Sequence, residues 1–334
     1  MLTFERLGSI VRGNAPLPDP SSPFDPRSIP VYIGIAVLIL VEMAYVVATD
    51  LRLDPNQFFG AFYGLALIAA CGLVAHRYGM TQTGGILQGF ALPPILGALT
   101  FAGSIILARH STGLADASLA AADSALGFDW LALFHLYQAN PAVVAVSRWI
   151  YASMLVQLPL VTILLFALGD ANRGWSFVTA WWIACLLTLA IFPLAPAAGP
   201  FVLNGIAPAD IPNLLREFPW TTGPTIAGLR DGSISDASQA MAGLVSFPSF
   251  HTAAGVMFAW AAWPFRWPRW PMVILNLAMI ASTLVSGSHY LIDLIGGAAV
   301  AFIAIAIAKV LVLRRAVQLT TYAQPTRPEA ADLV

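Results

Sequence analysis

Long apolar runs alternate with short polar segments along most of this chain. Eight of the runs are close to the length of about 20 residues that a helix needs to cross a bilayer. They cover residues 31–48, 58–75, 85–107, 146–168, 176–194, 249–265, 270–285 and 289–313. We therefore predict an all-α fold, a polytopic membrane helical bundle with about eight transmembrane helices.

The composition supports a membrane location. The chain has 334 residues, of which 58% are hydrophobic and 10% are charged, and its mean hydropathy is +0.77. A typical soluble domain is about 25% charged. The net charge of -1 provides no basic surface for a nucleic acid, so we expect no nucleic-acid partner.

The polar segments divide the chain into four parts. We predict a tail over residues 1–30, two accessory transmembrane helices in 31–84, the main membrane domain in 85–313 and a second tail over 314–334. No cleavable signal peptide is evident, so the first helix is expected to be retained. With the N-terminus inside, the inner segments hold most of the 16 basic residues, which predicts that both tails are cytoplasmic.

Two polar motifs interrupt the apolar runs near the C-terminus. The first, Phe247–Thr252, contains His251, and the second, Ser288–Asp293, contains His289. Ionisable groups at membrane depth are costly, and they are therefore usually functional. Each histidine opens a predicted helix, and the alternating topology places both helix starts on the outer side. We expect the two motifs to form one site there.

The residue types in these motifs suggest phosphoryl transfer. His289 and Asp293 are four residues apart, so they share one helix face. The carboxylate can accept the proton of one ring nitrogen and leave the other as a nucleophile. His251 has a suitable intrinsic pKa to protonate the leaving alcohol and then activate the acceptor. Because helix N-termini attract anions, we expect the two helix starts, the first capped by Ser249, to form a phosphate pocket.

The two motifs resemble the second and third signatures of the type 2 phosphatidic acid phosphatase superfamily. The patterns of those signatures are Pro-Ser-Gly-His and Ser-Arg-x5-His-x3-Asp. The positions that match are Pro248, Ser249 and His251 in the second signature, and Ser282, His289 and Asp293 in the third. The resemblance implies that His289, His251 and Asp293 are catalytic, that Ser249 contributes to phosphate binding, and that neither a metal nor another cofactor is needed.

The chain also departs from the superfamily pattern. Phe250 replaces the glycine, Thr283 replaces the arginine, and the first signature, Lys-x6-Arg-Pro, is absent. Together with residues 127–130 and 193–200, these departures resemble the inositol phosphorylceramide synthase-like (inositolphosphotransferase) branch. The resemblance implies a six-helix catalytic core within residues 85–313. Another cation must then bind the phosphate, and the candidates on the predicted outer side are Arg148 and Arg230.

The sequence thus predicts a membrane-embedded lipid phosphatase or phosphotransferase that acts at the outer leaflet through a phosphohistidine. With water as acceptor it is a phosphatase. With a lipid alcohol it transfers a head group such as inositol phosphate. Two alternatives stay open: a polyprenyl-diphosphate phosphatase, and a non-enzymatic lipid or proton-coupled transporter. We expect a bacterial inner membrane, with the site facing the periplasm, and the sequence leaves the oligomeric state open.

Overall fold

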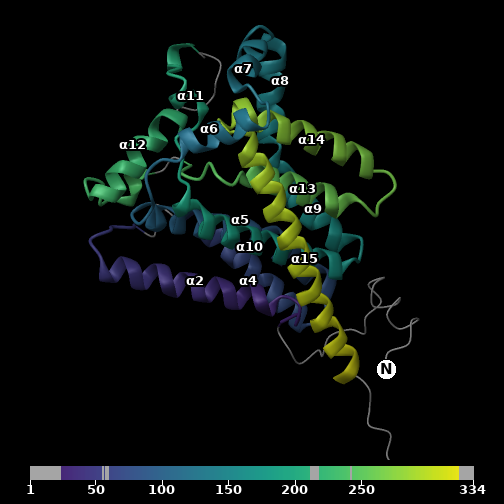
Figure 1. Cartoon of the computed structure of the whole chain (residues 1–334). Helices are drawn as coiled ribbons and strands as arrows, with labels where there is room; N and C mark the ends of the chain where they lie inside the picture. Colours follow the sequence, from purple (N-terminus) through teal and green to yellow (C-terminus); the bar gives the residue numbers. More distant parts are fainter. Residues whose placement is uncertain (1–23, 55, 57–59, 211–217, 241–242, 323–334) are drawn as a thin grey trace, which may run out of the picture.

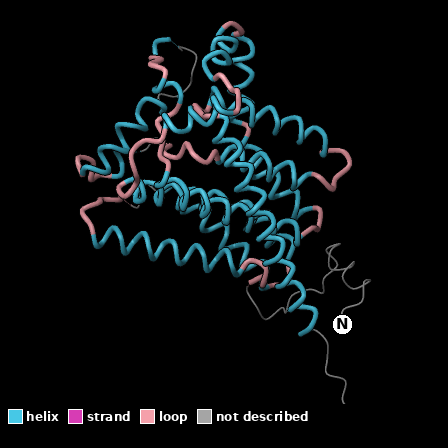
Figure 2. Tube along the Cα trace, viewed as in Figure 1, coloured by secondary structure: helices cyan, strands magenta, loops and turns pink. Residues whose placement is uncertain are grey.

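The computed structural model describes residues 24–54, 56, 60–210, 218–240 and 243–322. Within these residues the chain forms helices joined by loops, which confirms the predicted all-α bundle (Figure 2). Six segments of the described part are long and apolar enough to cross a membrane. They are α2 (Ile29–Ala48), α5 (Thr81–Ala108), α8 with α9 (Pro141–Ala167), α10 with its 3-10 extension (Ala171–Leu194), α14 (Arg269–Ser286) and the Leu291–Arg315 part of α15 (Leu291–Tyr322).

Two of the eight predicted transmembrane segments are helical but shorter than a span. These are α4 (Tyr63–Arg77), with 15 residues, and α13 (Phe250–Ala262), with 13 residues. The turn that follows α4 contains Gly79, which has a positive φ of 78°. Pro264 follows the C-cap of α13 and disfavours a longer helix. α13 packs against α10, α14 and α15, so most of its length faces protein and not lipid.

α10 is the central helix of the bundle. It packs against α5, α13 and α15, and residues on all of its faces are buried, as expected for a helix in the interior. α2 and α4 lie side by side with α5 at the periphery (Figure 1). At the crossing of α4 and α5, a Cβ atom on Gly84 would lie 2.8 Å from the carbonyl oxygen of Gly72, so glycine permits the close approach.

The end of the predicted N-terminal tail is part of the folded structure. Asp25 and Arg27 are buried and form an ion pair of 2.7 Å. Arg27 also donates to the side-chain oxygen of Asn172 at 2.7 Å, and the indole of Trp175 donates to Asp25 at 3.0 Å. These bonds fix the segment before α2 against the first turn of α10. Residues 1–23 of that tail and residues 323–334 of the second tail lie outside the described residues.

Short helices gather at the end of the bundle where α15 begins (Figure 1). They belong to two long connections: α6 (Asp116–Ala125) and α7 (Trp130–Gln138) lie between α5 and α8, and α11 (Pro200–Leu203) and α12 (Phe218–Asp231) lie between α10 and α13. α6 and α7 meet at an angle of 89°. α6 packs against both α11 and α15, so these connections surround the segment that carries the second histidine motif.

Candidate active site

A tight turn between α14 and α15 holds His289. The amide groups of Gly287 and His289 both donate to the carbonyl oxygen of Thr283, at 2.9 and 3.3 Å. Ser288 between them has a φ of 53°, which is uncommon for a residue other than glycine. Gly199 lies directly against Ser288, since a Cβ atom on Gly199 would overlap the serine side chain. The turn is therefore held by the hydrogen bonds to Thr283 and by the close packing of Gly199 against Ser288.

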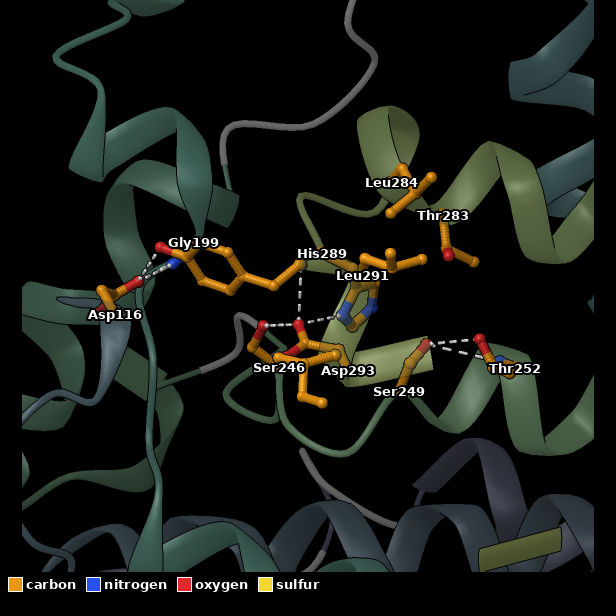
Figure 3. A network of polar contacts seen from close by, with 12 residues as sticks. Asp116, Gly199, Ser246, Ser249, Thr252, Thr283, Leu284, His289, Leu291 and Asp293 are labelled. Atoms are coloured by element: carbon orange, nitrogen blue, oxygen red, sulfur yellow. Dashed lines mark hydrogen bonds and ion pairs between the residues drawn. The ribbon is translucent and has the colours of Figure 1, made fainter. Parts of the chain in front are cut away.

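Asp293 orients the His289 ring, as Figure 3 shows. The Nδ1 atom of His289 lies 3.0 Å from Oδ2 of Asp293, and both side chains are buried. The same oxygen accepts a bond from the Ser246 hydroxyl and another from the amide of Tyr290, each at 3.0 Å. Because a carboxylate accepts the bond, Nδ1 carries the proton and Nε2 keeps the free lone pair.

His251 lies in the first turn of α13, as the sequence predicts. Ser249 is the N-cap of this helix and accepts from the amide of Thr252 at 3.4 Å. The ring of His251 stacks on the ring of Tyr151 from α8, with centroids 4.0 Å apart and an interplanar angle of 15°. The amide of Ser249 also donates to the carbonyl oxygen of Asp293 at 3.0 Å. The two motifs are thus joined directly through the backbone.

One cavity of about 700 Å³ brings the two histidines together. Its polar lining consists of these imidazoles, Tyr151 and hydroxyl side chains from four parts of the chain: Thr100, Ser104, Thr221, Thr222, Ser246 and Ser288. The described residues that line it include no lysine or arginine. A phosphoryl group in this cavity would meet hydroxyl groups and imidazoles.

Asp116 and Asp123 of α6 also hold the His289 segment, and the sequence reasoning missed both. Asp116 accepts from the Tyr290 hydroxyl at 2.9 Å and from the amides of Ala198 and Gly199 at 3.0 and 2.7 Å. Figure 3 shows this link between α6 and the segment after His289. Burial raises the pKa of Tyr290, so its hydroxyl keeps the proton that it donates.

Asp123 caps the start of α15. Its two carboxylate oxygens accept from the amides of Leu291 and Ile292 at 2.8 and 2.9 Å, and the side chain is buried. Seven residues separate Asp116 from Asp123, which places them on the same face of α6 two turns apart. In the sequence, the spacing of these two acidic residues is the pattern that could have indicated their role in holding the His289 segment.

The cap at α15 corrects the prediction that both helix starts bind phosphate. The amides of Tyr290, Leu291 and Ile292 already donate to the carboxylates of Asp293 and Asp123. A negatively charged group occupies this N-terminus, so the prediction is wrong for α15. The start of α13 remains a candidate for phosphate binding, because Phe250 and His251 line the cavity.

The three residues predicted to bind phosphate lie outside the lining of the cavity. Ser249 is fully buried, and its hydroxyl oxygen is bonded to Thr252. Arg148 of α8 is half-buried, near enough to Tyr137 for its charge to act on the tyrosine hydroxyl. Arg230 is exposed in the last turn of α12. The phosphate-binding role of these residues stays a prediction.

Thr283 stands where the signature has arginine. It is fully buried, and its hydroxyl donates to the carbonyl oxygen of Ile280 at 2.6 Å. Its side chain is therefore engaged within α14. For metal ions, the described part of the chain contains no group of three or more histidine, cysteine, aspartate or glutamate side chains that could hold one.

Comparison with known proteins gives one match. A family model described as the PAP2 superfamily matches residues 117–307, which is more than half of the chain. The matched region contains Asp123, both histidines and Asp293. The comparisons with curated proteins and with solved structures found no match.

Proposed function

Because the chain belongs to the PAP2 superfamily, which supports a lipid phosphatase type of function, we propose that it cleaves a lipid phosphoester through a phosphohistidine at His289. One observation carries the proposal. The bond of 3.0 Å between Nδ1 of His289 and Asp293 leaves Nε2 available, and His251 lines the same cavity. The family match supports a lipid phosphate as the class of substrate.

The proposed reaction has two steps. Nε2 of His289 attacks phosphorus and forms a P–N bond, and the P–O bond to the leaving alcohol breaks. His251 gives its proton to the leaving oxygen, while Asp293 stabilises the positive charge on the His289 ring. The acceptor hydroxyl then attacks phosphorus, His251 takes the proton of that hydroxyl, and the P–N bond breaks.

Two arginines are retained as proposed phosphate ligands. Arg148 precedes Tyr151 by three residues on α8, so both belong to neighbouring turns of one helix face. Arg230 lies in the last turn of α12, the helix whose first turns contain Thr221 and Thr222 of the cavity lining. Positive charge supplied from these helices would stabilise the equatorial oxygens of the phosphoryl group in the transition state.

Head-group transfer is a second candidate for the same site. The described lining residues carry no lysine or arginine, and this favours a phosphodiester donor, with one negative charge, over a monoester, which carries up to two near neutral pH. In this version a lipid alcohol replaces water, and a phosphorylated head group such as inositol phosphate moves to it. The proposed orientation places the site on the outer side, in a bacterial inner membrane facing the periplasm, since the basic residues favour cytoplasmic tails.

A lipid panel tests the proposed function. Purified protein in EDTA is incubated with phosphatidate, phosphatidylinositol with ceramide as acceptor, and undecaprenyl diphosphate. We expect turnover of at least one phospholipid, with free phosphate indicating hydrolysis and a new phospholipid indicating transfer. If no lipid phosphate turns over while the protein stays folded, the enzyme proposal is wrong. A flux assay in vesicles then tests the transporter alternative.

Alanine in place of Asp123 is expected to lower both stability and activity. The substitution removes two bonds to the start of α15, and loss of a helix cap costs about 1 kcal/mol. It also loosens the turn that presents His289, so we expect kcat to fall about tenfold, with KM nearly unchanged. Thermal unfolding and steady-state kinetics measure the two effects.

Asp129→Ala provides the matched control for this variant. Asp129 caps α7 through the amide of Ala132 at 2.9 Å, and it does not line the catalytic cavity. The control should lose stability and keep its kcat. Asp123→Asn keeps an oxygen that can accept a bond, so it should recover part of the activity. Equal kcat losses in Asp123→Ala and Asp129→Ala would refute the positioning role.

A further inference from the structure

The catalytic cavity continues from the histidines along α5. Four residues of this helix line it: Gly97, Thr100, Phe101 and Ser104. Their spacing of three, four and seven residues places them on one helix face, and at 1.5 Å per residue the stripe is about 10 Å long. Met154 of α9 lines the same cavity. The cavity therefore has a second part that the catalytic chemistry does not use.

This α5 wall presents an apolar surface despite its two hydroxyl residues. The hydroxyl of Thr100 donates to the carbonyl oxygen of Leu96 at 2.7 Å, and that of Ser104 donates to the carbonyl oxygen of Phe101 at 2.7 Å. Both hydroxyl protons are thus used within the helix. What remains for a ligand is the phenyl ring of Phe101, the carbon atoms of the small side chains and hydroxyl oxygens that have no proton left to donate to a phosphate. Such a wall suits a hydrocarbon chain.

Gly97 has no packing role in α5. A Cβ atom on it would meet no other atom within 4 Å, although it lies in the middle of a transmembrane helix. Other glycines of the same helix differ, since a Cβ atom on Gly85 or Gly89 would overlap the ring of Phe166. Glycine also costs about 0.5–1 kcal/mol relative to alanine in a helix interior. The empty space at Gly97 is the space of the cavity.

We propose that the α5 wall binds the hydrocarbon chain of the lipid phosphate and that Gly97 determines how long a chain the cavity admits. The inference rests on the proposed function and adds the position of the chain. Met154, which is flexible and apolar, lines the same space and adapts to chains of different shape. A larger side chain at position 97 fills space in the cavity that also borders Met154, so it leaves less room for a long hydrocarbon chain than for a short one.

Chain-length selectivity of Gly97→Leu tests the inference. The substrates are two pairs that share a head group, dioctanoyl and dioleoyl phosphatidate, and farnesyl and undecaprenyl diphosphate. For the pair that the wild type turns over, we expect kcat/KM of the longer member to fall at least tenfold, mainly through KM. For the shorter member we expect a change of less than twofold. Gly97→Ala should give an intermediate loss.

Gly64→Leu is the matched control. Gly64 also lies in a helix, a Cβ atom on it would meet nothing within 4 Å, and it is exposed outside the cavity. It should leave both kcat/KM values unchanged. Equal losses on long and short chains in Gly97→Leu, or no loss on either, would overturn the inference while leaving the proposed function intact. Wild-type protein that turns over no substrate of either pair, and no phosphatidylinositol with ceramide as acceptor, would refute both.

Discussion

Replacing His289 with alanine is expected to lower lipid phosphoester cleavage at least about a thousandfold. The substitution removes the atom that forms the P–N bond, and no other described imidazole is bonded to Asp293. The remaining groups of the cavity still bind substrate, so the loss should appear in kcat. Steady-state release of product from the best lipid of the panel measures it.

His135→Ala is the control for this experiment, because His135 is exposed on α7 and does not line the cavity. Its activity should match that of the wild type. Added imidazole should restore part of the activity of His289→Ala, since the small molecule can occupy the vacated space. Activity of His289→Ala within tenfold of the wild type would contradict the assignment of the nucleophile.

Asp293→Asn is expected to reduce kcat by about 10³–10⁴ while the fold is retained. An asparagine amide at this position can donate to Nδ1, and this would move the ring proton to Nε2 and remove the nucleophilic lone pair. The substitution also removes the negative charge that stabilises the ring when it becomes positive. Thermal unfolding checks that the buried site has stayed folded.

Ser246→Ala separates orientation by Asp293 from general disturbance of the site. It removes one of the bonds to Oδ2 of Asp293, and the bonds from His289 and Tyr290 remain. We expect a loss of less than about tenfold, as for one neutral hydrogen bond. Similar losses in Asp293→Asn and Ser246→Ala would show that the carboxylate has no special role.

Local patterns explain which parts of the site were predictable. His289 and Asp293 are four residues apart, so the sequence keeps them close, although His289 lies in the turn before α15 and only Asp293 lies in the helix. Apolar run lengths likewise predicted the helices. The contacts of Asp123 with Leu291 and Asp116 with Tyr290 join residues separated by 168 and 174 positions. No spacing rule connects such distant residues, and only the packing of α6 against α15 reveals them.

The position of Arg148 shows how an error in a helix boundary changes an interpretation. The apolar run that starts at residue 146 predicts that this residue lies near the start of a helix. α8 begins at Pro141, a residue favoured in the first turn of a helix. Arg148 therefore lies in the middle of α8, and the adjacent Ser147 bonds to Ser286 at 3.2 Å. Pro141 indicates this earlier helix start, which the length of the apolar run alone does not reveal.

Chemical trapping tests whether His289 carries the phosphoryl group between the two steps. The protein is mixed with phospholipid labelled at phosphorus, quenched in alkali within the first turnover, and digested for mapping. We expect a label that is stable in alkali, labile in acid, located on His289, and absent from His289→Ala. Label on another residue, or turnover without any labelled protein at early times, would contradict it.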